Sequence, residues 1–403
     1  MSAARDRFHQ PRRWWILFAY MLVVGMSQLL WLNFAPLLSL IEQRYGTSEL
    51  LASSLVLVFP LLYVPFSIPA GALIDARGYR FAVGLGAAAM AIFAALRIFD
   101  ASFWFLFAGQ FGIAVAQPLV VNGISKLVAD WFSEEQGALA TGLGTMGMFL
   151  GMAVGMASTP ALVGAFGMQM TMVVFAVVTA GVAVIFALVV RENPRQPMGV
   201  TQGSASARFG PLLRDRRLVL LFSLSFLGLG VFNGLTTWLE PILAPHGIGA
   251  EQAGLIGGAL ILGGIAGAVV IPALSDWLKR RKPFLVLCAA AALATIYPLC
   301  SGSRYHLLLV FAALHGFFFM PAFALLLEMS AQIAGVRSAG AATSLLMMAG
   351  NAGGVVVIVV MPLVKGDQPN FQPAVLLLSA LLAFTTAMTL FAPETSARRP
   401  IAT

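Results

Sequence analysis

The feature that most constrains this chain is a series of apolar runs, each about 20 residues long, that recur along its whole length. A helix rises 1.5 Å per residue, so each run is long enough to cross the roughly 30 Å of hydrocarbon in a bilayer. Charged residues make up only 10% of the chain and hydrophobic residues 60%, whereas soluble domains carry about 25% charged residues. The sequence therefore predicts an all-α integral membrane protein, and a soluble core is excluded as the explanation.

The apolar runs predict twelve transmembrane helices. The first run is too long for the apolar core of a signal peptide and lacks a small-residue cleavage site at a fitting distance, so we expect it to remain as the first helix. The expected spans are 14–40, 49–74, 81–99, 102–131, 137–166, 168–190, 218–245, 251–276, 283–301, 304–334, 337–365 and 370–392.

The distribution of basic residues predicts the orientation of these spans. If both termini are cytoplasmic, every Lys and Arg falls on the cytoplasmic side except Arg44, Arg97, Arg304 and Lys365. This is the positive-inside asymmetry. The net charge of +8 is therefore explained by topology, and we expect no nucleic-acid partner. The plasma (inner) membrane is the expected location.

A long polar stretch at 191–217 divides the chain into residues 1–190 and 218–403, each with six predicted helices. The stretch contains prolines, glycine, serine and several arginines, which is typical of a flexible linker. We expect two pseudo-symmetric six-helix bundles with the linker on the cytoplasmic side. Parallel repeats of this kind place a substrate site between the halves, near the middle of the membrane.

Short matches between the halves support an internal duplication. Phe107-Ala108-x-x-x-Gly112 recurs as Phe311-Ala312-x-x-x-Gly316, and Asp75 is matched by Asp276, at similar offsets. Glycines also recur every four positions, as small residues do where helices pack closely. Two interpretations stay open for these glycines, static packing and surfaces on which the halves slide. One such series is Gly147, Gly151 and Gly155.

The connection after the second predicted helix carries a charged motif. It contains Asp75, Arg77, Gly78 and Arg80, and the glycine would permit a tight turn. An aspartate there can pair with an arginine or a helix N-terminus and hold two helices in one state. The alternative is a group of solvated loop charges.

This motif strongly resembles the signature loop of the major facilitator superfamily. With the two sets of six helices, the resemblance covers the whole chain. It implies secondary transport, and it implies that Asp75, Arg77 and Asp130 form a charge cluster that holds the outward-facing form. Asp276 would take the equivalent place in the second half.

Polar residues inside the spans are candidates for the substrate site, because polar groups are costly in hydrocarbon. Asn233, Thr236, Thr237 and Glu240 form one polar stripe on a predicted helix. A stripe indicates either a watery cavity or a polar partner helix. Other candidates, for which ordinary packing stays open, are Gln28, Trp31, Gln110, Gln117, Ser344 and Asn351.

Further ionisable and sulfur-containing residues lie in the predicted spans. Glu328, as a buried carboxylate, would be a proton site, and the alternative is an ion pair or a cytoplasmic gate. Lys126 is a candidate partner for it. His315 is interpreted as a core histidine with its hydrogen bonds satisfied. Cys288 and Cys300 match no metal or redox spacing.

A closer resemblance is to the feline leukaemia virus subgroup C receptor family. It rests on Trp31-Leu-Asn33-Phe34, on Gly109-Gln110 running to Gln117, and on Ala129-Asp130-Trp131-Phe132, with Gly230-Val-Phe232-Asn233 in the second half. That family is associated with choline and ethanolamine uptake and with haem export.

The resemblance implies a cation site built from a tryptophan, a second aromatic residue and two glutamines. Trp31 and Gln117 match, Asn351 is one methylene shorter than the family's glutamine, and Asn233 replaces the second aromatic residue. Trp238 cannot replace it, because five residues along a helix turn it about 140° away. Glu240 would attract a cation instead.

The combined prediction is a transporter of a small organic solute, such as an amine or organic cation, that works by alternating access. Trp31, Gln117, Asn233, Glu240 and Asn351 would bind the substrate, with Glu240 or Glu328 as the alternative proton site. Efflux of amphipathic compounds is a second transport hypothesis, and a transport-dead sensor or receptor is a hypothesis of another class. We expect no enzymatic activity, no cofactor and no metal. The expected partners are the small-molecule substrate and membrane lipid, and the expected state is a monomer.

Overall fold

The computed structural model describes residues 12–191, 209–335 and 338–395, and these residues form helices joined by short connections. The chain divides into two compact units, residues 1–201 and 202–403. Ten helices in the described parts are long and apolar enough to cross a membrane. Most of the predicted linker, 192–208, lies outside the described residues.

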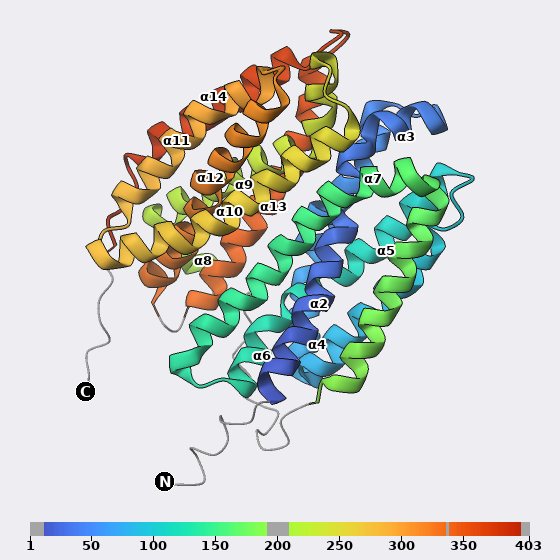
Figure 1. The fold of residues 1–403 in the computed structure, drawn as a ribbon. Helices are drawn as coiled ribbons and strands as arrows, with labels where there is room; N and C mark the ends of the chain where they lie inside the picture. The colour runs from blue at the N-terminus through green and yellow to red at the C-terminus, as the bar shows by residue number, and fades with distance from the viewer. Residues whose placement is uncertain (1–11, 192–208, 336–337, 396–403) are drawn as a thin grey trace, which may run out of the picture. The chain divides into compact units, whose positions relative to one another are not determined.

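Residues 12–191 of the first unit form six α-helices and one 3-10 helix, which can be followed in Figure 1. Their bounds are α2 Arg12–Leu32, η2 Ala35–Leu37, α3 Leu38–Tyr45, α4 Glu49–Leu96, α5 Phe103–Val121, α6 Gly123–Trp131 and α7 Glu134–Val189.

The second unit contains the remaining described elements. They are α8 Phe209–Leu212, α9 Arg216–Leu243, η4 Ala244–His246, α10 Ala250–Leu278, α11 Lys282–Ser301, α12 Tyr305–Ala334, α13 Ala339–Lys365 and α14 Gln372–Thr389.

Two helices, α4 and α7, each cover two of the predicted spans. They contain 48 and 56 residues, whereas one span needs about 20. Each is interrupted by one glycine with positive φ, Gly78 at φ 80° and Gly167 at φ 78°. At Gly78 a single glycine changes the chain direction where the sequence predicted a connection of several residues, 75–80, and at Gly167 the break falls on the one residue left between the predicted spans 137–166 and 168–190. Glycine has no Cβ to oppose this conformation. The predicted turn at Gly78 is confirmed.

Two other predicted spans are divided. The span expected at 14–40 ends as α2 at Leu32 and resumes as η2 and α3, with Pro36 at the start of η2. Pro36 has no N–H to donate to the carbonyl oxygen of Leu32, four residues earlier, so the α-helix ends there. The span expected at 102–131 divides at Asn122 into α5 and α6.

Glycines bring the helices of each unit close together. In the first unit α2 and α7 lie side by side (Figure 1), and a Cβ on Gly151 would collide with the backbone of Gly25. In the second unit a Cβ on Gly353 of α13 would collide with the backbone of Phe226 on α9. These contacts lie within single units, so they agree with the static-packing interpretation.

Candidate functional site

Trp31, near the end of α2, is held by a carbonyl that a proline leaves without a helical partner. Its Nε1 donates a hydrogen bond to the carbonyl oxygen of Val56 on α4 at 3.1 Å. In an α-helix that oxygen would accept from residue 60, but residue 60 is Pro60 and has no N–H. The indole also stacks on Phe59 with ring centroids 6.1 Å apart, and Trp31 is 8% exposed.

The carbonyl oxygens beside this contact bind Gln110 of α5. Gln110 Nε2 donates to the carbonyl oxygens of Leu30 at 3.1 Å and of Leu55 at 3.0 Å. Its Oε1 accepts from Arg97 Nη1 at 2.9 Å. Gln117 lies two turns further along α5 and is also buried, at 4% exposed. The predicted pair Trp31 and Gln117 therefore lies buried in one unit, on helices that contact each other.

The junction between α5 and α6 contains a polar group that the sequence analysis missed. Tyr63 donates to Asn122 Oδ1 at 2.8 Å, and Asn122 Nδ2 donates to Ser67 Oγ at 3.0 Å. Asn122 is the single residue between the end of α5 and the start of α6.

In the second unit the predicted polar stripe of α9 is buried, with exposed fractions between 0% and 5%. Asn233 packs against Gly354 of α13, where a Cβ would contact its side chain, and its Nδ2 donates to the carbonyl oxygen of Leu229 at 2.8 Å. Asn351 lies three residues before Gly354 on α13. At Asn233, the stripe therefore meets a partner helix, which is the second interpretation offered by the sequence.

Buried polar atoms without a hydrogen bond remain on this stripe. Among the described residues they include Asn233 Oδ1 and Thr237 Oγ1. Glu240 is 5% exposed and has an interaction partner. Unpaired buried polar atoms of this kind destabilise the folded protein unless water or a ligand reaches them. The stripe therefore remains a candidate binding surface.

The motif after the second predicted span lies around Gly78. Asp75, Arg77 and Arg80 are exposed, and the guanidinium of Arg77 lies 5.0 Å from the ring centroid of Phe81. Asp130 is buried at 8%, and its carboxylate lies 3.6 Å from Lys126 Nζ. Lys126 thus has a partner other than the one proposed from sequence, and the Asp75, Arg77 and Asp130 cluster stays a prediction.

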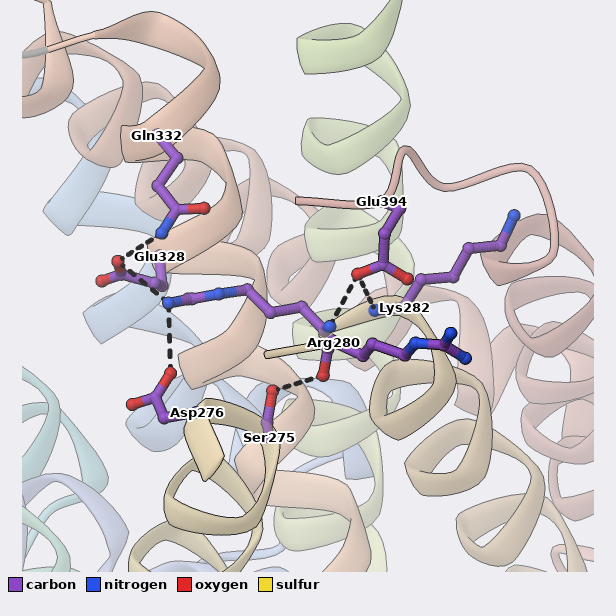
Figure 2. Close-up of polar contacts among 8 residues, drawn as sticks. Ser275, Asp276, Arg280, Lys282, Glu328, Gln332 and Glu394 are labelled. Carbon is purple, nitrogen blue, oxygen red and sulfur yellow. Dashed lines mark hydrogen bonds and ion pairs between the residues drawn. The ribbon is translucent and has the colours of Figure 1, made fainter. Parts of the chain in front are cut away.

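The equivalent region of the second unit is an ion-pair cluster around Arg281, drawn in Figure 2. Arg281 Nη2 lies 3.3 Å from Asp276 Oδ1 on α10 and 3.3 Å from Glu328 Oε1 on α12. The Arg281 side chain is 6% exposed, while the two carboxylates are 60% and 53% exposed. Burial lowers the pKa of Arg281 from its ordinary value, and the neighbouring carboxylates of Asp276 and Glu394 oppose that shift.

Glu394, which follows α14, completes the cluster and was missed by the sequence analysis. Its Oε1 accepts hydrogen bonds from the backbone N–H groups of Arg281 at 2.7 Å and Lys282 at 3.3 Å (Figure 2). These N–H groups stand at the start of α11, where the first turn of a helix lacks internal acceptors. The segment after α14 is therefore attached to the connection between α10 and α11.

Glu328 requires a correction. The proton-site hypothesis assumed a buried carboxylate, but its side chain is 53% exposed and pairs with Arg281; it also accepts from Gln332 at 3.0 Å. The ion-pair alternative is the one that the structure supports. Glu328 lies near the end of α12, and Arg281 lies just before α11. The fold brings these two segments together.

His315 is buried in the second unit, in agreement with its interpretation as a core histidine. His315 Nδ1 lies 3.0 Å from Thr295 Oγ1, and the ring stacks on Phe319 at 5.2 Å. Cys288 and Cys300 are buried and free. No group of metal-binding side chains occurs among the described residues that were searched.

The second unit also contains a cavity of about 40 Å³ lined by residues of α9, α11, α12 and α14. Its lining is almost entirely apolar and includes Leu229, Cys288 and Phe323. None of the predicted substrate residues lines it, and a cavity of this size holds a few water molecules at most. It is therefore separate from the predicted substrate residues.

Comparisons with known proteins agree with this architecture. A bacterial homologue of the human lysosomal transporter Spinster has a similar structure, with a TM-score of 0.74, 18% identity, and coverage of 95% of this chain and 97% of that one. A choline/ethanolamine transporter of Danio rerio, flvcr2b, is 26% identical over 83% of this chain and 74% of its own length.

A further relative is an MFS-type transporter of Caenorhabditis elegans, C09D4.1, which is 26% identical over 95% of this chain and 69% of its own length. The family model described as Major Facilitator Superfamily matches residues 16–358. With ten candidate membrane helices, the protein is an integral, multi-pass membrane protein. The chain belongs to the major facilitator superfamily of transporters.

Proposed function

We propose that this protein carries a small organic cation, such as choline, ethanolamine or another amine, across the plasma membrane by alternating access. The observation that carries the proposal is the geometry at Trp31. Its indole is held at a defined orientation by Val56 and Phe59, and Gln117 lies buried two turns beyond Gln110 on the neighbouring helix. A fixed indole face attracts a cation with about 0.5–2 kcal/mol.

The second unit supplies the other proposed contacts. Asn233, Glu240 and Asn351 would face the substrate from α9 and α13, and the carboxylate of Glu240 would compensate for the aromatic residue that Asn233 replaces. The relationship to a choline/ethanolamine transporter supports the same substrate class. Glu240 would also be the site of proton coupling, if the transporter uses protons.

The proposed topology has twelve spans with both termini in the cytoplasm. Because α4 and α7 each have the length of two spans and break at a glycine, they would each cross the membrane twice. Asp75, Arg77, Gly78, Arg80 and Asp130 in the first half, and Asp276 in the second, would stabilise one of the alternating states. The proposed functional form is a monomer with the domains 1–190 and 218–403.

A thermal-shift screen of the purified protein tests the substrate class. The ligands are choline, ethanolamine, other amines and haem, and a ligand that binds the folded state raises the melting temperature with its concentration. Two variants at one position give a matched comparison. Trp31→Leu and Trp31→Phe both lose the bond to Val56, but only Trp31→Leu loses the aromatic face.

We expect saturable stabilisation by an amine that disappears in Trp31→Leu and persists, weakened, in Trp31→Phe. If none of the amines raises the melting temperature, the proposal is contradicted. Stabilisation by lipophilic cations alone, with growth protection against them, would support the efflux hypothesis instead.

A further inference from the structure

The first unit contains a buried arginine with an incomplete set of partners. Arg97 is 0% exposed, and among the described residues its Nε and Nη2 have no hydrogen-bond partner. The nearest acidic residue in sequence, Asp100, pairs with Arg44. The guanidinium lies 5.5 Å from the ring centroid of Phe34. A buried cation without a carboxylate is costly, so its presence calls for a role that compensates.

The space for Arg97 is provided by a glycine. A Cβ on Gly109 of α5 would collide with the side chain of Arg97. The chain therefore has a small residue immediately before Gln110, and the arginine passes over it to reach the Gln110 amide. The contact between Arg97 and Gln110 thus depends on two adjacent residues of α5.

Arg97 and two backbone carbonyls favour the same orientation of the Gln110 amide. A guanidinium has only donors, so the amide group must turn its oxygen toward Arg97 Nη1 and its nitrogen away. The nitrogen then donates both of its hydrogens, to the carbonyl oxygens of Leu30 and Leu55. Without Arg97, the two carbonyls would still select the amide nitrogen, but the amide oxygen would be buried without its donor, which is costly and weakens the hold of Gln110 on this site.

The carbonyl groups that Gln110 binds are adjacent to Trp31 and Val56. The Leu30 carbonyl belongs to the peptide that joins Leu30 to Trp31, and the Leu55 carbonyl to the peptide that precedes Val56. The Leu30 carbonyl is also among the last four of α2, which lack a full set of partners within the helix. Gln110 therefore holds the two backbone segments between which the indole of Trp31 makes its bond.

We propose that Arg97 and Gln110 are positioning residues that set the orientation of the Trp31 indole for substrate binding; this rests on the proposed function. Gln110 contacts the backbone beside Trp31, Arg97 contacts Gln110, and neither residue belongs to the proposed substrate contacts. Loss of either group releases the end of α2 from α4, and the indole loses its defined orientation. If Arg97 and Gln110 only held the helices together, their loss would change neither the surroundings of the Trp31 indole nor the contribution of Trp31 to substrate binding.

Fluorine NMR tests the positioning without any substrate. The protein is labelled with 5-fluorotryptophan, and the signals of Trp31 and Trp238 are assigned from their absence in Trp31→Phe and Trp238→Phe. The test variants are Gln110→Met, which keeps the volume and loses the donors, and Arg97→Met. Gln110→Glu retains an acceptor for Arg97 and loses the donors to the carbonyls, so it serves if Arg97→Met does not fold. Arg44→Met is the control at the same end of the unit.

We expect the Trp31 signal to shift or broaden in Gln110→Met, Gln110→Glu and Arg97→Met, and to stay unchanged in Arg44→Met. The Trp238 signal should stay unchanged in all four variants. An unchanged Trp31 signal in Gln110→Met and Gln110→Glu would overturn the proposal.

A double-mutant cycle with choline or another bound amine extends the test to binding. We expect Gln110→Met to weaken binding by about three- to tenfold when Trp31 is present, and by less than twofold in Trp31→Phe. Equal weakening in both backgrounds would overturn the proposal. If the unmodified protein binds no amine, the proposed function fails, while the fluorine spectra still decide whether Arg97 and Gln110 position Trp31.

Discussion

The indole N–H of Trp238 on α9 donates to the carbonyl oxygen of Ile358 on α13 at 3.1 Å. This repeats in the second unit the arrangement of Trp31 and Val56 in the first. Pro362 lies four residues after Ile358 in α13, so the Ile358 carbonyl also lacks its helical donor. In each unit, a tryptophan of one helix satisfies a backbone acceptor that a proline leaves open in another.

Trp238→Phe should therefore destabilise the protein, and Pro362→Ala should restore part of the loss. The phenylalanine leaves the Ile358 carbonyl unpaired in an apolar interior, which costs about 1–3 kcal/mol. An alanine at 362 supplies an N–H that can donate to that carbonyl. Thermal unfolding in detergent should rank the double variant above Trp238→Phe, and a double variant no more stable than the single one would contradict this account.

Gly151→Ala should lower the melting temperature, whereas Gly164→Ala should not. Both glycines lie in α7, but a Cβ at Gly151 would meet the backbone of Gly25, and at Gly164 it would meet nothing within 4 Å. Overpacking of a close helix contact costs about 1–3 kcal/mol, because backbone cannot move aside as a side chain can. Equal melting temperatures of the two variants would show that α2 and α7 are not in contact at this point.

Removing both carboxylates that pair with the Arg281 guanidinium should lower the free energy of unfolding by more than the sum of the two single changes. In Asp276→Asn or Glu328→Gln, Arg281 keeps one carboxylate, and because the two carboxylates are half exposed, each single loss should be under about 1 kcal/mol. The double variant leaves a buried guanidinium without its two ion pairs, so a coupling of about 1 kcal/mol is expected. Asp215→Asn is the control, since Asp215 and Arg217 form an exposed pair. Additive shifts in melting temperature would contradict a shared role of Arg281.

Uptake of an organic cation into proteoliposomes should follow the membrane potential. A potential of about 100 mV is worth about 2.3 kcal/mol per charge, which corresponds to roughly fifty-fold accumulation. Glu328→Gln should leave any dependence on a proton gradient unchanged, because Glu328 is half exposed and paired. Glu240→Gln should weaken cation uptake, and unaltered uptake would remove Glu240 from the proposed site.

The apolar runs and the basic residues were sufficient to predict a multi-pass helical membrane protein, and the Asp75 motif was sufficient to indicate the superfamily. These features depend on composition and local spacing, which are properties of the sequence and do not require tertiary contacts. The span boundaries were predicted less well. Around Gly78 one glycine with positive φ replaces the expected connection 75–80, whereas at Gly167 the break falls on the single residue left between two predicted spans. The sequence indicates that a glycine permits such a turn, but not how many flanking residues stay helical.

The partners of the buried polar groups were decided by the tertiary structure alone. Glu328 looked like a buried carboxylate because α12 is apolar, yet α10 and α11 bring Arg281 to it. Trp31 was predicted as a substrate residue, but the bond to Val56 and the support from Gln110 depend on contacts across tens of residues. The sequence alone determined which segments enter the membrane, since hydrophobic transfer is a property of each segment. Which polar groups meet was determined by helix packing, because hydrogen bonds and ion pairs require atoms within a few ångströms.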